Sequence, residues 1–302
     1  MKIVRRGCPA VSDGSKPNML GTIEVSEFQI LGGDRFGINL KLTQVSVVLA
    51  CLTAFLCGCQ PSSGPVNPNV SGNWQISFTP TSGSALFPDA SGYIKEDITD
   101  NGASKFTTAE LTETSSAECF VGGNAIFATG TIKGTEMTLD SASVNGQSVE
   151  IYSTLNASST QFTGTYQVAG GCANGSAGSV SGTEYAPLTG TYSGSVTGSN
   201  PAQTIQLQLT QNGEGNGNGD FLVAGTLLAT GFSCFNSGTI TVPNGFVSGS
   251  SAQLDIVTND ASDAQLILKG NLDQAAGTLT LSTINVTSGA CAGLYGTATL
   301  TR

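Results

Sequence analysis

Short segments in which apolar and polar residues alternate recur from residue 70 to the end of the chain. In 204–210, Ile205, Leu207 and Leu209 fall on one side of an extended backbone and polar residues fall on the other. None of the alternating segments has the length or the 3.6-residue period of a helix. The pattern predicts an all-β protein, with about eight strands in the first half of this region. These strands are expected at 72–78, 92–99, 105–112, 126–132, 136–143, 147–155, 161–168 and 179–184.

The strand region contains two copies of one sequence pattern. Ser-Gly-Asn-Trp at 71–74 returns as Thr-Gly-Thr-Tyr at 189–192, which is 118 residues later. A period of this length indicates two domains, because the repeats of solenoids are about 20–50 residues long. We therefore expect one domain at 70–186 and a second at 187–302. Further matched pairs are Cys119-Phe120 with Cys234-Phe235, and Gly164-Thr165-Tyr166 with Gly277-Thr278-Leu279.

Short connections between the segments favour an up-and-down order, in which each strand pairs antiparallel with the next. Eight strands in this order can close into a barrel that has no exposed edge. Asn-Gly at 101–102 and 212–213 is typical of hairpin turns, because both residue types accept positive φ. The connections 79–91, 113–125 and 169–178 are longer than those at the opposite end, so we expect an open mouth there, pointing away from the N-terminal anchor side.

Four cysteines occupy equivalent connections in the two copies. Cys119 follows the third predicted strand and Cys172 the seventh, so an up-and-down barrel places both at one end. Cys234 and Cys291 take the same places in the second copy. In an oxidising compartment we expect the disulfides Cys119–Cys172 and Cys234–Cys291. A metal site is the alternative, but the wide spacing and the absence of His from the chain disfavour it.

An apolar stretch of thirteen residues, 45–57, follows Lys41 and runs into Leu-Cys-Gly-Cys at 56–59. It has the length of a secretory signal core and is shorter than the about 20 residues of a transmembrane helix. The motif resembles the lipobox of bacterial lipoproteins, which implies cleavage before Cys59 and attachment of lipid to Cys59. The residue after Cys59 is Gln60 rather than Asp, which is similar to the pattern of lipoproteins that are sorted to the outer membrane. The resemblance therefore implies a lipid-anchored location in the cell envelope. A cleaved signal without lipid and a buried strand are the alternatives.

Three N-terminal segments follow from this interpretation. Residues 38–58 are expected to form the signal peptide, and 59–69, rich in Pro, Ser and Asn, a flexible tether. Residues 1–37 contain acidic side chains and show no helical period, so we interpret them as an extension upstream of a start near Ile38 or Leu40. A separate N-terminal domain is the alternative, although so short a piece could hardly bury a core.

Charge narrows the choice of partners. Residues 59–302 carry five Lys and Arg against seventeen Asp and Glu, a net charge of −12. So acidic a surface repels phosphate, and no nucleic-acid partner is expected. It also repels an anionic bilayer, so attachment to a membrane must come from the lipid. Few charges and many Gly, Ser and Thr suit a secreted β protein, and the regular alternation argues against disorder.

The chain resembles the lipocalins and the wider calycin group in a Gly-x-Trp at the start of the first strand of an eight-stranded meander. Gly72 and Trp74 match the motif, and Gly190 and Tyr192 match it with Tyr in place of Trp. The resemblance implies that Trp74 and Tyr192 close the base of each barrel and that the open mouth takes small, mostly apolar ligands. The chain has no second lipocalin motif and no clear basic residue to pack over Trp74. Arg302 lies at the end of the last strand of the second domain, so it is expected to accompany Tyr192 instead.

The sequence does not favour catalysis or a cofactor. Without His, neither a Ser-His-Asp nor a Cys-His arrangement can form. The carboxylates of Glu96 and Asp97 lie on alternate faces of a strand, which favours a solvated surface over a glycosidase site. The run 213–220 offers Glu, Asn and Asp oxygens to Ca²⁺, but it lacks the Glu at loop position twelve and favours a flexible hairpin loop. We expect no enzyme and no metal site.

Two functions remain from the sequence. The first is a small-molecule carrier or sensor, in which Phe120 and Phe235 line a pocket for an apolar ligand near each mouth. The alternative is a surface structural or adhesive module, in which the barrels are filled and hold no ligand. An interior cavity on the order of several hundred Å³ would favour the carrier, and a packed interior with an exposed apolar patch would favour the module.

Overall fold

The computed structural model describes residues 68–302 apart from 101–104, 121–123, 200–201, 216–217 and 260–263. The signal peptide, Cys59 and most of the tether therefore lie outside the described residues, as does the Asn-Gly turn at 101–102. Every regular element in the described part of the chain is a β-strand, which confirms the all-β prediction. Among these residues there is no helix that is long and apolar enough to cross a membrane.

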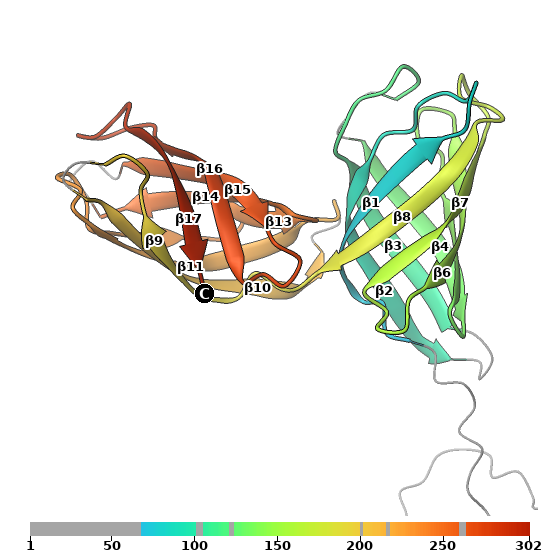
Figure 1. Cartoon of the computed structure of the whole chain (residues 1–302), viewed down its shortest axis with the longest axis horizontal. Helices are drawn as coiled ribbons and strands as arrows, with labels where there is room; N and C mark the ends of the chain where they lie inside the picture. Colours follow the sequence, from blue (N-terminus) through green and yellow to red (C-terminus); the bar gives the residue numbers. More distant parts are fainter. Residues whose placement is uncertain (1–67, 101–104, 121–123, 200–201, 216–217, 260–263) are drawn as a thin grey trace, which may run out of the picture. The chain divides into compact units, whose positions relative to one another are not determined.

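The first domain is a closed barrel of eight antiparallel strands (Figure 1). Each strand pairs with the next along the chain, and the last pairs with the first, with Asn73 opposite Tyr185 and Pro80 opposite Gly178. The predicted up-and-down order is therefore confirmed, and each strand lies within two residues of its predicted bounds. The strands are β1 (Gly72–Pro80), β2 (Ala90–Asp100), β3 (Lys105–Glu113), β4 (Ala125–Lys133), β5 (Glu136–Ser141), β6 (Ser148–Leu155), β7 (Gln161–Ala169) and β8 (Ala177–Tyr185).

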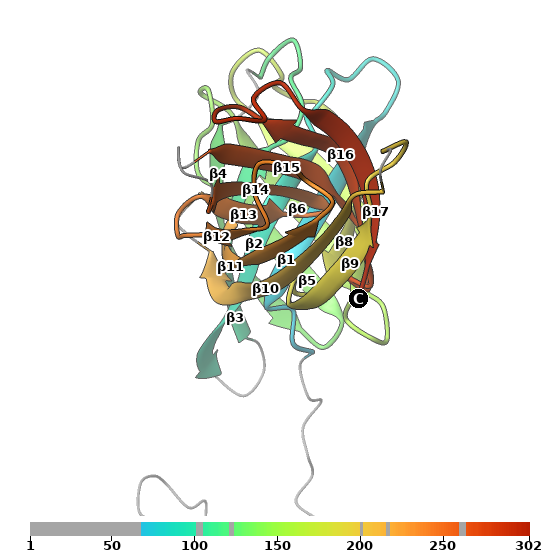
Figure 2. The same ribbon diagram turned by 90° about the vertical axis from the view of Figure 1, so that its left-hand side faces the viewer.

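The second domain repeats this architecture, and Figure 2 shows its strands arranged around a ring. The short strands β12 and β13 both pair with β11 on one side and with β14 on the other, so they act as one interrupted strand. Pro243 lies in the interruption, where it has no N–H to donate to a neighbouring strand. The strands are β9 (Gly190–Ser195), β10 (Thr204–Gly215), β11 (Phe221–Thr230), β12 (Ser237–Ile240), β13 (Gly245–Ser248), β14 (Ser251–Thr258), β15 (Gln265–Leu272), β16 (Thr278–Val286) and β17 (Tyr295–Thr301).

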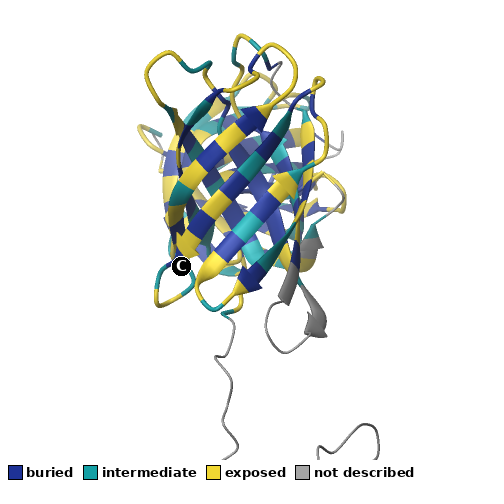
Figure 3. Cartoon of the chain, turned by 90° about the vertical axis from the view of Figure 1, so that its right-hand side faces the viewer, coloured by how far each residue is buried: buried dark blue, intermediate teal, exposed yellow. Residues whose placement is uncertain are grey.

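The alternation along the sequence is also an alternation of burial. Figure 3 shows buried and exposed residues following one another along the strands of the first barrel. In β10, the side chains of Ile205, Leu207 and Leu209 are buried, as the pattern predicts. In β7, Phe162 and Tyr166 are buried in the same way. Each barrel therefore encloses an apolar core of inward-facing side chains.

Two details of the sequence prediction are wrong. Asn212 and Gly213 lie inside β10 rather than at a turn, because the strand continues through a bulge to Gly215, which pairs with Phe221. The match of Gly164 with Gly277 also fails, because Gly164 lies in the middle of β7 and Gly277 precedes β16. In both places a Gly that suits a turn is also compatible with a bulged or closely packed strand.

Both predicted disulfides are present. Cys119 bonds to Cys172 across 53 residues, and Cys234 bonds to Cys291 across 57 residues. In the first barrel the bond joins the β3–β4 connection to the β7–β8 connection at one end of the ring. Strand parity alone brings these connections together, which confirms the reasoning that predicted the pairing.

Removing the first disulfide with Cys119→Ala and Cys172→Ala should lower the free energy of unfolding by about 4 kcal/mol, because a loop of 53 residues is no longer closed in the unfolded chain. Urea titration followed by tryptophan fluorescence measures this, because Trp74 is the one Trp in the chain and reports the first barrel. The matched control is Cys234→Ala with Cys291→Ala, which should lower the stability of the second barrel by about the same amount. A loss below about 1 kcal/mol in the first pair would contradict the expectation.

Candidate functional site

The disulfide end of the first barrel is where the sequence places a ligand-binding mouth. Phe120, a predicted ligand-lining residue, is only 2% exposed there. Its ring lies 4.6 Å from that of Phe87, which lies 4.5 Å from Phe78, and Phe78 in turn meets Tyr166 edge-on at 5.1 Å. These four side chains form an aromatic plug beneath the disulfide end of the barrel.

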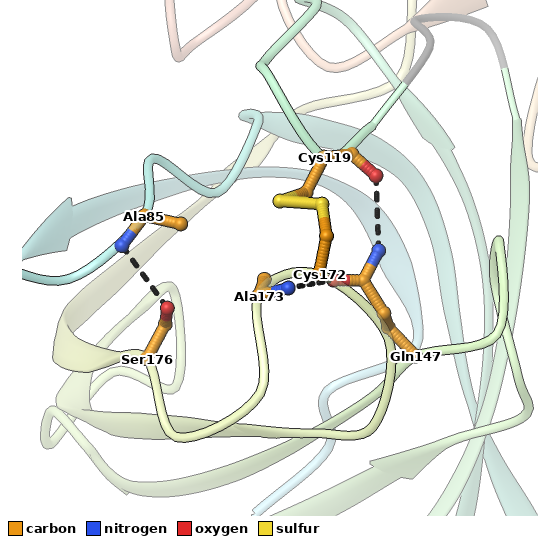
Figure 4. The surroundings of a disulfide bond; sticks show 6 residues. All are labelled: Ala85, Cys119, Gln147, Cys172, Ala173 and Ser176. Atoms are coloured by element: carbon orange, nitrogen blue, oxygen red, sulfur yellow. Dashed lines mark hydrogen bonds between the residues drawn. A yellow bond between two sulfur atoms is a disulfide. The ribbon is translucent and has the colours of Figure 1, made fainter.

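The loops above the aromatic plug are joined to one another (Figure 4). The side chain of Gln147, which is 2% exposed, donates to the carbonyl oxygen of Cys119 at 2.9 Å and accepts from the backbone N–H of Ala173 at 2.7 Å. The backbone N–H of Ala85 donates to the Ser176 hydroxyl at 3.0 Å. Together with the disulfide, these bonds connect four loops and hold them over the barrel end.

A cavity lined by described residues inside the first barrel is very small. It measures about 10 Å³ and is lined by Phe78, Phe87, Ala90, Leu111, Ile126, Ala128, Leu139, Ser141, Val149 and Ile151. A space of about 10–15 Å³ is needed to hold one water molecule, whereas pockets for small ligands are about 300–1,000 Å³. The side chains that line this space are almost all apolar, so it is a packing gap in the core.

The predicted ligand-lining residue of the second barrel is also packed into the core. Phe235 is 5% exposed and belongs to the apolar core of that barrel. Its ring stacks on Phe232 at 4.8 Å, and Cys234 and Cys291 pack against the same core. Phe120 and Phe235 therefore occupy equivalent places next to a disulfide, and both are packed against other side chains.

The opposite end of each barrel holds the predicted base aromatics. Trp74 and Tyr192 are both fully buried, at equivalent places in β1 and β9. The indole N–H of Trp74 donates to the carbonyl of Val70 at 2.8 Å, and the hydroxyl of Tyr192 donates to the carbonyl of Ala276 at 2.7 Å. Val70 and Leu188, which the sequence analysis did not single out, are also fully buried. Aligning the two copies on Gly72 and Gly190 would have found both, because each lies two residues before the Gly.

One position at the base carries opposite charges in the two barrels. Glu184 pairs with Trp74, and Arg302 directly follows Thr301, which pairs with Ser193, so Arg302 stands opposite Tyr192. Burial raises the pKa of Glu184. Burial also raises the pKa of Tyr192, while its hydrogen bond with Arg302 acts in the opposite direction. A basic residue thus accompanies the base aromatic of the second barrel, and a carboxyl accompanies that of the first.

Two hollows lie on the outer surface of the first barrel, over β5, β6 and β7. The larger measures about 400 Å³ and the smaller about 230 Å³. We call them together the outer groove. The larger is lined by Glu136, Met137, Thr138, Tyr152, Ser153, Thr154, Thr163, Gly164 and Thr165. The smaller, further along the same strands, is lined by Asp140, Ser141, Ser148, Val149, Glu150, Gln167, Val168 and Ala169.

Other candidate chemistry is sparse in the part of the chain that the structure describes. There, no group of three or more Cys, Asp or Glu side chains is placed to hold a metal ion. The run 213–220, considered as a Ca²⁺ loop, lies partly outside the described residues. Burial raises the pKa of Asp220 at its end, and a hydrogen bond with Ser248 opposes this effect.

Neither a family model nor any of the curated proteins matches the chain.

Replacing Phe120 with Ala should destabilise the first barrel by about 3–5 kcal/mol, because a buried ring is removed from a packed cluster. The control is Phe127→Ala on β4, where a ring of the same size is 48% exposed and the change should stay within about 0.5 kcal/mol. Urea unfolding followed by Trp74 fluorescence gives both values. Equal effects of the two variants would show that Phe120 does not form a packed plug.

Replacing Glu184 with Gln should stabilise the protein at pH 7. Because burial raises the pKa of Glu184, its ionisation opposes folding above that pKa, and this penalty disappears as the pH falls toward about 4, where the unfolded chain also binds the proton. The gain from Glu184→Gln should therefore shrink between pH 7 and pH 4, as thermal unfolding at several pH values can measure. Glu118→Gln makes the same chemical change on an exposed loop. A variant that is less stable than the wild type at pH 7 would contradict the assignment.

Proposed function

We propose that the chain is a lipid-anchored protein of the bacterial cell envelope whose two filled barrels form a structural or adhesive module. The observation that carries this proposal is the packed interior of the first barrel, where the cavity measures about 10 Å³ beneath the aromatic plug. An apolar-ligand carrier, the other function considered from the sequence, would need roughly thirtyfold more space. The bonds between the loops at the disulfide end also disfavour a mouth that opens to admit a ligand.

The disulfides support a location outside the cytoplasm, where such bonds persist. The number of cysteines supports the proposed lipid anchor. Cys8, Cys51 and Cys57 precede the cleavage position that the lipobox-like motif implies, and four of the others form the two disulfides. Cys59 is then the one mature cysteine without a disulfide partner, as a lipidated cysteine requires. Under this proposal the tether separates the barrels from an outer-membrane anchor.

The experiment is native mass spectrometry of the full-length protein purified from the membranes of its host. A filled module predicts the mass of the processed chain plus lipid on Cys59, with no further small molecule released on unfolding. The variant Cys59→Ser is expected to lose the lipid mass and to leave the membrane fraction. The control is Ser62→Cys in the same tether, which leaves Cys59 and the anchor intact.

An apolar molecule retained in stoichiometric amount by either barrel would overturn the filled-module proposal and favour the carrier. Membrane association that persists in Cys59→Ser would overturn the lipid anchor, whatever the barrels contain. The two parts of the proposal are therefore tested separately.

A further inference from the structure

The outer groove follows three neighbouring strands, β5, β6 and β7, which are also consecutive in the sequence. Its outward-facing residues form three successive rows across β5, β6 and β7, set by the pairing of these strands. With a rise of about 3.3 Å per residue, the six steps along β6 from Ser148 to Thr154 give the groove a length of about 20 Å. The rows are Glu136–Thr154–Thr163, Thr138–Tyr152–Thr165 and Asp140–Glu150–Gln167.

Tyr152 stands at the centre of these rows. Its side chain is 46% exposed. The ring therefore lies on the water-facing surface of the sheet, where it does not pack into the core. Its hydroxyl donates a hydrogen bond to the carboxylate of Glu150 on the same face of β6. This bond, which raises the pKa of the phenol, holds the Tyr152 hydroxyl while its oxygen can still accept from a ligand.

The row next to Tyr152 places two carboxylates opposite each other. Asp140 on β5 pairs with Glu150 on β6, and like charges at directly opposite positions destabilise a sheet. Burial, and then the charge of Glu150, raise the pKa of Asp140. A local conflict of this kind is expected where a surface serves function rather than stability.

The equivalent face of the second barrel lacks these features. Counted from the hairpin that precedes β5 and β14, Tyr152 corresponds to Lys269 and Glu150 to Ile267. The pair that corresponds to Asp140 and Glu150 is therefore Asp255 and Ile267, which carries one charge instead of two. The combination of an exposed ring with two opposed carboxylates is thus a property of the first barrel, and duplication of the fold does not by itself require it.

The lining of the outer groove limits the chemistry of its ligand. It contains carboxylates, hydroxyls and an amide, and neither Lys nor Arg. Anionic ligands would meet unpaired negative charge, and an apolar ligand would strip water from these polar groups without replacing their hydrogen bonds. An uncharged sugar fits both limits, because its hydroxyls can donate to the carboxylates and its C–H face can stack on an aromatic ring.

We propose that the outer groove of the first barrel binds an uncharged oligosaccharide, which stacks on Tyr152 and donates hydrogen bonds to Glu136, Asp140 and Glu150. The proposal rests on the filled-module function, to which it adds a ligand class. The length of the groove favours several sugar units over a single one. Binding outside a filled barrel needs no opening of the loops at the disulfide end.

The test is isothermal titration of the full-length, detergent-solubilised protein with cellotetraose, maltotetraose and tetra-N-acetylchitotetraose. At least one of these probes is expected to bind, and tetragalacturonate, an anionic chain of the same length, is expected not to bind. Tyr152→Ala should weaken binding by about tenfold, since it removes both a stacking surface and a hydrogen bond. Tyr152→Phe keeps the ring and should keep most of the affinity.

Two variants serve as matched controls. Lys269→Ala changes the corresponding position of the second barrel, and Phe127→Ala removes an exposed ring of the first barrel that does not line the groove. Both should leave the affinity unchanged, and circular dichroism should show that Tyr152→Ala melts like the wild type. The proposal is overturned if none of the three uncharged probes binds, if tetragalacturonate binds as tightly, or if Tyr152→Ala and Lys269→Ala have equal effects.

Native mass spectra of the same samples separate this proposal from the one on which it rests. A small apolar molecule retained inside a barrel would overturn the filled module, whatever the titrations give. Absence of both a retained molecule and oligosaccharide binding would overturn the groove proposal and leave the filled module standing.

Discussion

Closure of each sheet by the pairing of its first and last strands is the constraint on which the rest of the structure depends. β1 pairs with β8 from Asn73 to Pro80, and β9 meets β17 at Ser193 and Thr301. A closed ring exposes no strand edge and gives each strand one face toward the interior. An eight-stranded ring is just wide enough for side chains to fill, so large inward residues such as Trp74, Phe162 and Tyr166 occupy it.

Because the interior of a filled barrel has no room for a ligand, any binding site is expected on the outer surface. At one end the base aromatics and their neighbours Val70 and Leu188 are buried, and at the other the aromatic plug lies under loops joined by a disulfide. The surface of the first barrel, by contrast, carries polar rows in fixed register across β5, β6 and β7. A rigid sheet holds such rows at constant spacing, which suits recognition of an extended ligand without internal motion.

The sequence predicts much of this fold for two reasons. Strand burial has a period of two residues, and the same order of strands and cysteines occurs in both copies of the repeat. Strand bounds, ring order and both disulfides follow from that period and from strand parity. The packing of Phe120 could not be predicted, since whether a ring beside a mouth points inward or lines a pocket depends on the loops above it. The outer groove could not be predicted either. Thr138, Tyr152 and Thr165 become neighbours through strand register, and no local pattern marks them.

Titration with an apolar fluorescent probe such as N-phenyl-1-naphthylamine tests most directly whether the barrels are filled. Probe fluorescence rises in any apolar environment, so interior binding is recognised by saturation at one probe per barrel and by its loss when Phe120 or Phe235 is replaced. If the barrels are filled, we expect no saturable increase with the folded protein, and an increase only as urea loosens the core. Saturable binding of one probe per barrel to the native protein, weakened by substitution of Phe120 or Phe235, would contradict it.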